Sequence, residues 1–559
     1  MKYLNSFKIL CLGLLTLLSA HVFGQTKTQE IATFTKVWGF LKYHHPALAS
    51  GKVNWDSVYV RNLPKIQHSG SNIEFNKLLL SIINNLGELQ KIHPAILSDS
   101  LFTQNHDLRW IDQNQLISKA VRSKLKDIYT YRNQGDNQYI KLKYQTADYS
   151  GENKYDSMVL PDQDYRLLFL ARFWNAINYF APYKYEIGEE WGNVLSRFIP
   201  KMITAKDTLS YYQTLLQLAV SLNDGHSQLT IGSENAPINN LVFGKYTAPV
   251  YAVIIDGKVI VRKLAGDSLN TINLKRGDVI LSIDNEPVAK RIARLGTYIS
   301  ASGNVSRNKY LAWILFDTHN IYQTLKIKRG DKILTVKVKC IPAAKRDWRD
   351  LTDYTFNNTG YKTIGNSIAY VYASQIWHGD IDTIKALIKR SKAVIFDVRN
   401  YPNNDDFYNI FDIFLPEPKV INQSLYLSIN NPGYFKWQPS PRLGNINKSP
   451  YSGPVIILAD ERSQSQGEYS TMCLQTIPNS VTIGSQTAGA DGVVTQIPMG
   501  GKLAISYSGY GIFYPDKTPT QRRGIKIDIS VKKTVESVVK DKDLAVEEAL
   551  KYLKERGID

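Results

Sequence analysis

A long-range repeat is the feature that most constrains the fold of this 559-residue chain. A helical, aromatic-rich pattern runs from Glu30 to Glu88 and returns between Tyr165 and Leu229. Five residues recur at one offset of 136 positions, without a gap: Trp38 and Trp174, Pro46 and Pro182, Trp55 and Trp191, Leu79 and Leu215, and Leu86 and Leu222. Because five matches in one register are hard to obtain by chance, we expect a duplicated N-terminal helical unit.

The two copies end in different sequences. The first copy closes as Leu86–Gln90, which reads Leu-Gly-Glu-Leu-Gln, and the second contains Asn223–Ser227, which reads Asn-Asp-Gly-His-Ser. A lone histidine is most often a structural residue. His226, however, follows a glycine turn and leads into a strand-like run, where functional residues concentrate. We therefore take His226 as a candidate functional residue, with a structural role as the alternative.

Residues 1–24 have the pattern of a secretory signal. Lys2 and Lys8 give a positive start, Ile9–Leu18 is apolar, and Val22–Gly24 offers a small-residue cleavage site. The apolar run is too short to span a bilayer, and no later run reaches about 18 apolar residues. We expect an exported chain, periplasmic or extracellular and associated with the envelope surface at most, without stable membrane insertion.

Composition excludes several classes of protein. Only Cys340 and Cys473 follow the signal, so two buried free thiols are expected, with a single bridge as the alternative. Removing residues 1–24, with two lysines and no acid, lowers the formal charge from +18 to +16. The charges are spread along the chain rather than blocked, which argues against nucleic-acid binding. The sequence holds no metal-site or phosphate-loop motif, so we predict neither metal nor organic cofactor.

The segment after the repeat predicts a small β domain. Val250–Val261 alternates around the Asp256-Gly257 turn, which is a hairpin signal, and further strands are expected at 324–327 and 333–338 with a helix at Lys290–Ile299. The run Gly277–Val288 resembles a PDZ domain, which binds extended peptides by adding them to a sheet edge. The glycine-rich carboxylate-binding loop of such domains is missing from the matching segment, Lys245–Pro249.

From about residue 350 the pattern becomes α/β. Short apolar runs alternate with a helical stretch at Ile381–Lys389, which predicts right-handed crossovers and a mostly parallel sheet. The expected strands are Ile368–Tyr372, Ala393–Val398, Val455–Leu458 and Val481–Ile483. Ligands at such sheets bind beyond the carboxyl ends of the strands, and Asn400 and Ser465 both follow a strand.

These patterns divide the chain into segments. We predict a signal at 1–24, an N-terminal helical domain with a strand-containing insert at 25–160, a second helical repeat with the histidine at 161–235, a PDZ-like β domain at 236–345, an α/β sheet domain at 346–540 and a C-terminal helix at 541–559. The fold class is therefore multidomain α/β.

The stretch Ser463–Glu468, which reads Ser-Gln-Ser-Gln-Gly-Glu, lies between the strand Val455–Leu458 and a helical segment at Glu468–Ile477. A serine at a tight strand-to-helix turn has the geometry of a nucleophile elbow, with backbone N–H groups facing a developing oxyanion. The sequence of this stretch differs from the usual Gly-x-Ser-x-Gly motif. On these residues alone, a helix N-cap is the preferred interpretation.

Five motifs in order over residues 165–535 resemble the C-terminal processing (tail-specific) serine peptidase family. The motifs are Asn223–Ser227, Gly277–Val288, Phe396–Asn400, Ser463–Glu468 and Thr520–Ile525. The resemblance implies a sheet domain of the ClpP/crotonase-like spiral type and a hydrolase that acts on protein or peptide substrates.

The resemblance also implies roles for individual residues. The family's nucleophile lies three residues before the motif's glutamate, which selects Ser465 and puts Glu468 in a supporting position, with Ser463 and then Ser470 as fallbacks. Many members pair the serine with a lysine, but Ala490 occupies that position here. The branch similar to the tricorn protease core instead uses a histidine in an Asp-Gly-His motif, which corresponds to His226. Since serine at its free pKa is a poor nucleophile, we predict a Ser465–His226 pair.

The remaining site residues stay open. Gln521 stands near the position where that branch has a glutamate, and Asp224, Glu468 or Asp491 could supply the carboxylate instead. For the oxyanion hole we expect the N–H of Gln466. The second donor should follow Asp397-Val398-Arg399, and because Pro402 has no N–H it must be Tyr401 or Asn403.

Three functions are compatible with these features. The first is an exported serine endopeptidase that cleaves unfolded or C-terminal protein segments through an acyl-enzyme. The second is a catalytically inactive relative that binds peptides or hydrophobic ligands in the same cleft, and the third is an envelope scaffold. The placement of His226 relative to Ser465 distinguishes the first from the others.

Overall fold

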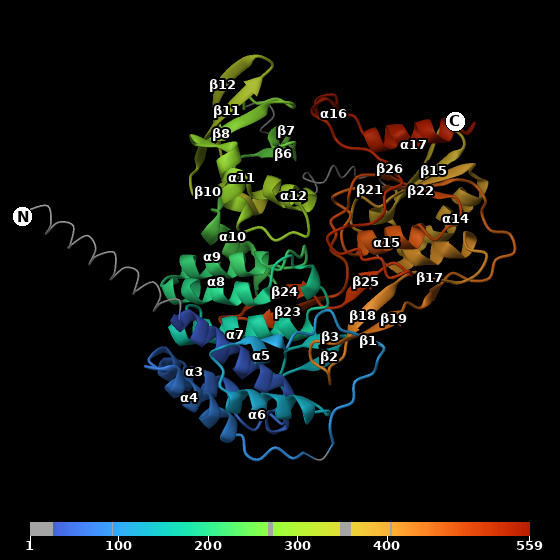
Figure 1. Cartoon of the computed structure of the whole chain (residues 1–559). Helices are drawn as coiled ribbons and strands as arrows, with labels where there is room; N and C mark the ends of the chain where they lie inside the picture. Colours follow the sequence, from blue (N-terminus) through green and yellow to red (C-terminus); the bar gives the residue numbers. More distant parts are fainter. Residues whose placement is uncertain (1–25, 92, 266–271, 347–358, 403–404) are drawn as a thin grey trace, which may run out of the picture. The chain divides into compact units, whose positions relative to one another are not determined.

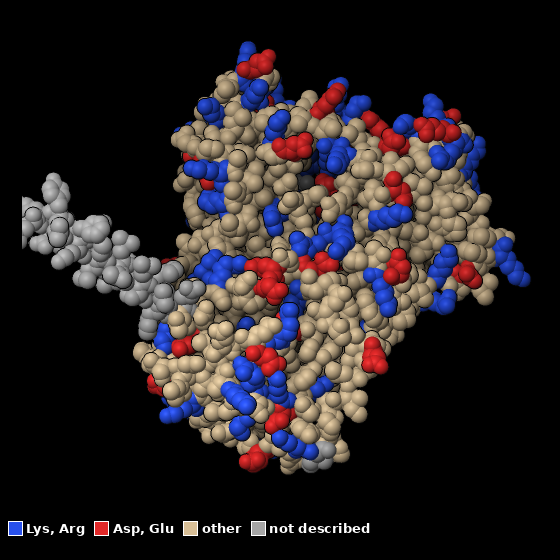
Figure 2. Space-filling view, viewed as in Figure 1, with Lys and Arg blue, Asp and Glu red and all other residues tan. Residues whose placement is uncertain are grey.

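The computed structural model describes residues 26–91, 93–265, 272–346, 359–402 and 405–559 (Figure 1). The predicted signal at 1–24 lies outside these ranges. The chain forms two compact units: Met1–Thr214 with Leu427–Lys436 and Thr495–Ile505, and Leu215–Tyr426 with Trp437–Val494 and Ser506–Asp559. No helix among the described residues is long and apolar enough to cross a membrane. Basic and acidic side chains are interspersed over the visible face, as the spread of charge in the sequence predicts (Figure 2).

Helices dominate the first unit and follow the sequence repeat. The first copy consists of a helix over residues 26–44, α2 (Pro46–Ala49), α3 (Trp55–Gln67) and α4 (Asn72–Asn84). The second consists of α7 (Gln163–Phe180), η1 (Lys184–Glu186), α8 (Trp191–Thr204) and α9 (Thr208–Val220). Both α3 and α8, and likewise α4 and α9, begin at the offset found in the sequence. Between the copies lie β1 (Leu101–Phe102), α5 (Arg109–Gln113), α6 (Lys119–Thr130), β2 (Lys141–Lys143) and β3 (Thr146–Asp148).

The paired tryptophans explain why the repeat keeps these residues. The indole N–H of Trp38 donates to the carbonyl of Trp55 at 2.9 Å, and the indole of Trp55 donates back to Trp38 at 2.9 Å. Trp174 and Trp191 make the same reciprocal pair at 2.8 and 2.9 Å. In each copy the two rings are stacked. Each pair links the first residue of one helix, α3 or α8, to the long first helix of the same copy, and it buries two large aromatic surfaces.

A small antiparallel sheet lies in the second unit, in the order β12-β11-β8-β7-β6. The predicted hairpin is confirmed, because Asp256 and Gly257 both have positive φ, 49° and 73°, at the turn between β6 and β7. The helix expected at Lys290–Ile299 starts earlier, directly after Pro287. The elements are β6 (Val250–Ile255), β7 (Lys258–Leu264), β8 (Val279–Ile283), β9 (Glu286–Pro287), α11 (Val288–Gly296), α12 (Asn304–Ile314), β11 (Tyr322–Arg329) and β12 (Lys332–Lys339).

The C-terminal sheet has the order β14-β15-β16-β21-β22-β26, and all neighbours pair in parallel except the edge strand β14. The four predicted strands and the mostly parallel sheet are thus confirmed. The strands are β14 (Tyr361–Ile364), β15 (Ile368–Tyr372), β16 (Ala393–Asp397), β21 (Val455–Ala459), β22 (Ser480–Gly484) and β26 (Ile529–Ser530).

Both faces of this sheet are covered, which is why its strands are continuous apolar runs. One face packs on α14 (Ile381–Arg390) and α15 (Gln466–Leu474), and the other on α17 (Leu544–Lys554).

Cys340 and Cys473 are buried and free, as expected. Other elements are β4 (Leu229–Ile231), α10 (Ala236–Val242), β5 (Tyr246–Thr247), β10 (Asp317–Thr318), β13 (Ile341–Pro342), η3 (Ala343–Lys345), η4 (Ala373–Gln375), η5 (His378–Asp380), η6 (Asp405–Ile413), β17 (Lys419–Val420), β18 (Gln423–Leu427), β19 (Phe435–Pro439), β20 (Arg442–Leu443), β23 (Val494–Pro498), β24 (Leu503–Ser508), β25 (Gly511–Phe513) and α16 (Val535–Val539).

Candidate active site

Ser465 occupies a strained turn between β21 and α15. It is the N-cap residue of α15, with φ 53° and ψ −118°. A non-glycine residue in this region costs of the order of 1–3 kcal/mol and persists only where its surroundings hold it. Here the N–H of Ser465 donates to the carbonyl of Ala490 at 2.9 Å, and its own carbonyl accepts from Tyr469 N–H at 2.9 Å. The turn has the strained strand-to-helix form of a nucleophile elbow.

Only one of the three candidate serines has an available hydroxyl. Ser463 is fully buried and donates to the carbonyl of Val398 at 2.9 Å. Ser470 is also fully buried and lies 3.2 Å from the Tyr408 hydroxyl. Ser465 is half-buried, and its hydroxyl makes no hydrogen bond within the part of the chain that the structure describes. The position therefore favours Ser465 over both fallbacks.

The imidazole of His226 is held by a serine and a carboxylate. The Nδ1 atom of His226 lies 2.9 Å from Ser508 Oγ, and Ser508 Oγ lies 3.0 Å from Asp224 Oδ1. Asp224 also accepts from Ser508 N–H at 2.7 Å and from His226 N–H at 3.0 Å. Because the single Ser508 hydroxyl proton goes to the carboxylate, Ser508 Oγ accepts from Nδ1–H of the ring. This assignment leaves Nε2 of His226 as the basic nitrogen.

The protonation state of His226 follows from its surroundings. Burial lowers the pKa of His226 below its ordinary value of 6.5, while the Asp224 charge opposes that shift. The net direction is downward, so the ring is neutral at pH 7. A neutral ring can accept a proton at Nε2.

The turns that carry His226 and Ser465 are in contact. A Cβ atom added to Gly225 would lie 2.9 Å from Cβ of Ala490, and Gln464 Nε2 donates to the Gly225 carbonyl at 3.3 Å. Ala490 in turn accepts the N–H of Ser465. The residues that immediately precede His226 and Ser465 therefore touch, although no direct hydrogen bond between the imidazole and the Ser465 hydroxyl is present among the described residues. Ala490 is fully buried at this contact, so the turn around Gly225 lies next to the position at which many members of the resembled family have a lysine.

Glu468 anchors the loop behind Ser465. Its carboxylate is fully buried and accepts from Gly489 N–H at 2.7 Å, from Ala490 N–H at 2.9 Å and from the Thr487 hydroxyl. Burial raises the pKa of Glu468, and these donors partly oppose the shift. Through Ala490, Glu468 positions the carbonyl that holds the Ser465 turn.

The two other candidates for the third site residue contact different groups. Gln521 Nε2 donates to Asp224 Oδ1 at 3.3 Å, and Gln521 Oε1 is buried with no partner among the residues described. Asp491 accepts from Gly492 N–H at 2.7 Å, while its buried Oδ2 has no hydrogen-bond partner within the same described ranges. Of the carboxylates, Asp224 alone is linked to the His226 ring through one residue, Ser508. Ser508 carries no motif in the sequence, so sequence reasoning missed it.

The buried Asp491 predicts a pH-dependent stability. Burial, and then the neighbouring Glu468, raise the pKa of Asp491 well above its usual value. The native state thus retains a proton that the unfolded chain releases, and stability falls as pH rises above about 4. We expect Asp491→Asn to raise the free energy of unfolding by about 1–2 kcal/mol at pH 8 and to change it little at pH 4, measured by urea denaturation. An equal effect at both pH values would contradict a protonated Asp491.

The proposed oxyanion donors lie on two neighbouring segments. Gln466 is the first residue of α15, and its N–H has no acceptor in the described parts of the chain. The loop after β16 adjoins this turn, because Pro402 Cδ lies 3.9 Å from a Cβ position built on Gly467. Tyr401 lies in that loop with a side chain 60% exposed. The alternative donor, Asn403, lies outside the described residues.

Comparisons with known proteins agree with this architecture. Residues 367–531 match the model of peptidase family S41, and residues 254–340 match the N-terminal domain model of Bacteroidetes S41-family peptidases. A search of curated protein sequences found no match. Mature CPAF complexed with lactacystin has the same fold over 70% of this chain and 98% of its own, with a TM-score of 0.54 and 15% identity. Mature CPAF alone covers 67% of this chain and 94% of its own, with a TM-score of 0.53 and 14% identity. The chain is therefore a serine peptidase of family S41, the C-terminal processing peptidases.

Proposed function

We propose that this peptidase is an exported endopeptidase that forms an acyl-enzyme on Ser465, with His226 as general base. One observation carries the proposal: the His226 turn packs on the Ser465 turn through Gly225 and Ala490. That packing brings the two turns together, and the proposal adds the hydrogen bond between Ser465 Oγ and Nε2 of His226. Catalytic hydrogen bonds are often incomplete without substrate.

The chemistry follows from the contacts of each residue. Ser465 Oγ attacks the scissile carbonyl carbon, and its proton passes to Nε2 of His226. The imidazolium keeps its Nδ1–H on Ser508 Oγ, and the Asp224 carboxylate behind Ser508 stabilises the positive charge. The oxyanion is stabilised by the N–H of Gln466 and by that of Tyr401. Nε2 then protonates the departing amine, and water hydrolyses the acyl-enzyme by the reverse proton route.

Substrate choice and location follow from the other segments. The small β sheet has two edges, β6 and β12, where an extended peptide can pair with the backbone. Unfolded or C-terminal protein segments can supply such a strand, whereas most backbone groups of a folded domain are already hydrogen-bonded. The secretory-signal pattern of residues 1–24 supports a location in the periplasm or outside the cell.

A fluorophosphonate probe tests this function. We expect the mature protein to be labelled at Ser465, with no label on Ser465→Ala and labelling roughly 100-fold slower on His226→Ala, because the serine needs its base. Ser463→Ala is the matched control, since Ser463 lies two residues away in the same turn with its hydroxyl on the Val398 carbonyl. Labelling is measured by mass spectrometry of the modified peptide.

The same experiment separates the enzyme from an inactive relative. A labelled protein should also degrade unfolded casein, and Ser465→Ala should not. If the wild type takes no label and casein survives, the cleft binds peptides or hydrophobic ligands without cleaving them. Labelling of Ser463 instead of Ser465 would overturn the assignment of the nucleophile.

A further inference from the structure

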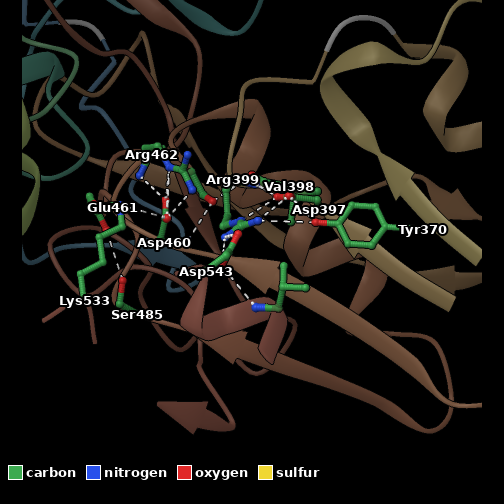
Figure 3. Close-up of polar contacts among 12 residues, drawn as sticks. Tyr370, Asp397, Val398, Arg399, Asp460, Glu461, Arg462, Ser485, Lys533 and Asp543 are labelled. Carbon is green, nitrogen blue, oxygen red and sulfur yellow. Dashed lines mark hydrogen bonds and ion pairs between the residues drawn. The ribbon is translucent and has the colours of Figure 1, made fainter. Parts of the chain in front are cut away.

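A second polar site lies at the carboxyl ends of the sheet strands, beside the Ser465 turn. A cavity of about 580 Å³ opens there, beyond β16, β21 and β22. Asp397, Asp460 and Ser485 line it from the ends of these three strands, and Figure 3 shows them with the basic side chains around them. The proposed peptidase chemistry uses none of these groups.

Two equivalent Asp-x-Arg motifs line this cavity. Arg399 folds back on Asp397 with Nε–Oδ1 and Nη2–Oδ2 distances of 2.9 and 2.7 Å, and Arg462 folds back on Asp460 with the same two distances. Tyr370 donates its hydroxyl to Asp397 Oδ2 at 2.8 Å. The motifs follow adjacent parallel strands, so the two guanidinium groups lie in one cavity.

The two guanidinium groups are close enough to influence each other's partners. Burial alone would raise the pKa of Asp397, but Arg399 and then Arg462 lower it. Burial likewise opposes ionisation of Asp460, and the surrounding cations, among them Arg462 and Arg399, hold its pKa well below the usual range. The arginine of each motif therefore also stabilises the charged form of the aspartate in the other motif. A bound anion would reduce the repulsion between the two arginines.

The lining carries more basic than acidic groups. The acids are Asp397, Asp460, Asp541 and Asp543. Besides the two arginines, six more basic side chains line the cavity: Arg262, Lys263, Arg276, Lys362, Lys533 and Lys542. Lys362 lies over the rings of Tyr370 and Tyr372, at 5.0 and 5.4 Å from their centroids, and makes no ion pair with any described residue. The first turn of α17 also lines the cavity and adds its positive dipole end.

We propose that this cavity binds a compact polyanion with two or more phosphate groups. The forks of Arg399 and Arg462 are held by Asp397 and Asp460, and Arg399 also pairs with Asp543, so the lysines would donate to the phosphate oxygens while the arginines add attraction at longer range. Several negative charges are needed to balance the eight basic side chains that line the cavity against four acids. The volume suits a small phosphorylated molecule and excludes a folded protein or a nucleic-acid duplex. The site does not depend on the proposed function, because none of the lining residues has a part in the proposed peptidase chemistry.

Tripolyphosphate is the probe that tests this site. In calorimetric titrations of the mature protein at constant ionic strength, we expect saturable one-site binding, stronger for tripolyphosphate than for orthophosphate, with a rise in Tm. Lys362→Gln and Lys542→Gln should each weaken binding about tenfold. Both side chains are exposed, so the variants should fold normally. Lys326→Gln, an exposed charge on β11 away from the cavity, is the matched control and should bind as the wild type does.

Three outcomes would overturn the proposal. One is no binding of tripolyphosphate at millimolar concentration. Another is equal binding by the wild type and both cavity variants, which would place the anion elsewhere. The third is an equal loss in Lys326→Gln, which would show that binding follows net charge and not the cavity. Fluorophosphonate labelling is scored separately, so failure of this site and failure of the peptidase assignment are distinguishable.

Discussion

Alanine in place of Ser465, of His226 or of both is expected to lower kcat by nearly the same factor, roughly 10⁴ to 10⁶. In the proposed mechanism the two side chains act as one unit, since the hydroxyl is nucleophilic only when its proton has an acceptor. Once either is lost, the other has no partner, and removing it costs little more. The activity that remains is expected to come from substrate binding and from the proposed oxyanion donor, the N–H of Gln466. Initial rates on an unfolded protein substrate measure all three variants.

A neighbouring serine on α15 supplies the control for these variants. Ser470→Ala changes a buried serine of α15 and should retain wild-type kcat, apart from a modest loss of stability. A double variant whose loss equals the product of the two single losses would contradict the pair, because independent groups multiply their effects. Full activity of His226→Ala would assign the base to another residue.

The sequence predicts the parts of the fold that local patterns determine. The strands β15, β16, β21 and β22 were predictable because both faces of the sheet are covered, which makes each strand a short apolar run. The hairpin at Asp256-Gly257 was predictable because its turn needs two residues that tolerate positive φ. The position of Ser465 in a strand-to-helix turn follows from the same local signals.

Contacts between segments that are far apart in the sequence cannot be predicted from such local patterns. Ser508 binds His226 across 282 residues, and a serine at a strand end has no signature. The twin Asp-x-Arg motifs were likewise visible as sequence, but their meeting in one cavity depends on the parallel pairing of β16 with β21. Gln521 was placed near the site by its motif, yet its contact with Asp224 rather than with the ring depends on tertiary structure.

Asparagine in place of Asp224 is expected to lower kcat about 10² to 10³-fold and to move the acid limb of the kcat/KM profile to lower pH. The loss is smaller than that for a carboxylate in direct contact with the imidazole, because Ser508 stands between them. The sign of the pH shift follows from the forces on His226: burial lowers its pKa and Asp224 opposes that effect. Without the carboxylate the pKa falls further, so the ring stays neutral in more acidic solution. A pH–rate profile from pH 4 to 8 measures both effects.

Two further variants identify which residue orients the imidazole. Ser508→Ala should reproduce most of the loss in kcat, because it breaks the path from Asp224 to Nδ1. Gln521→Ala should cost less than about tenfold, since Gln521 reaches only the carboxylate, at 3.3 Å. A large loss in Gln521→Ala with near-normal Asp224→Asn would assign the orienting role to the amide instead. If the acid limb of Asp224→Asn moves to higher pH, the carboxylate does not act on His226 in the way its contacts indicate, because losing a negative neighbour cannot raise the pKa of a cationic acid.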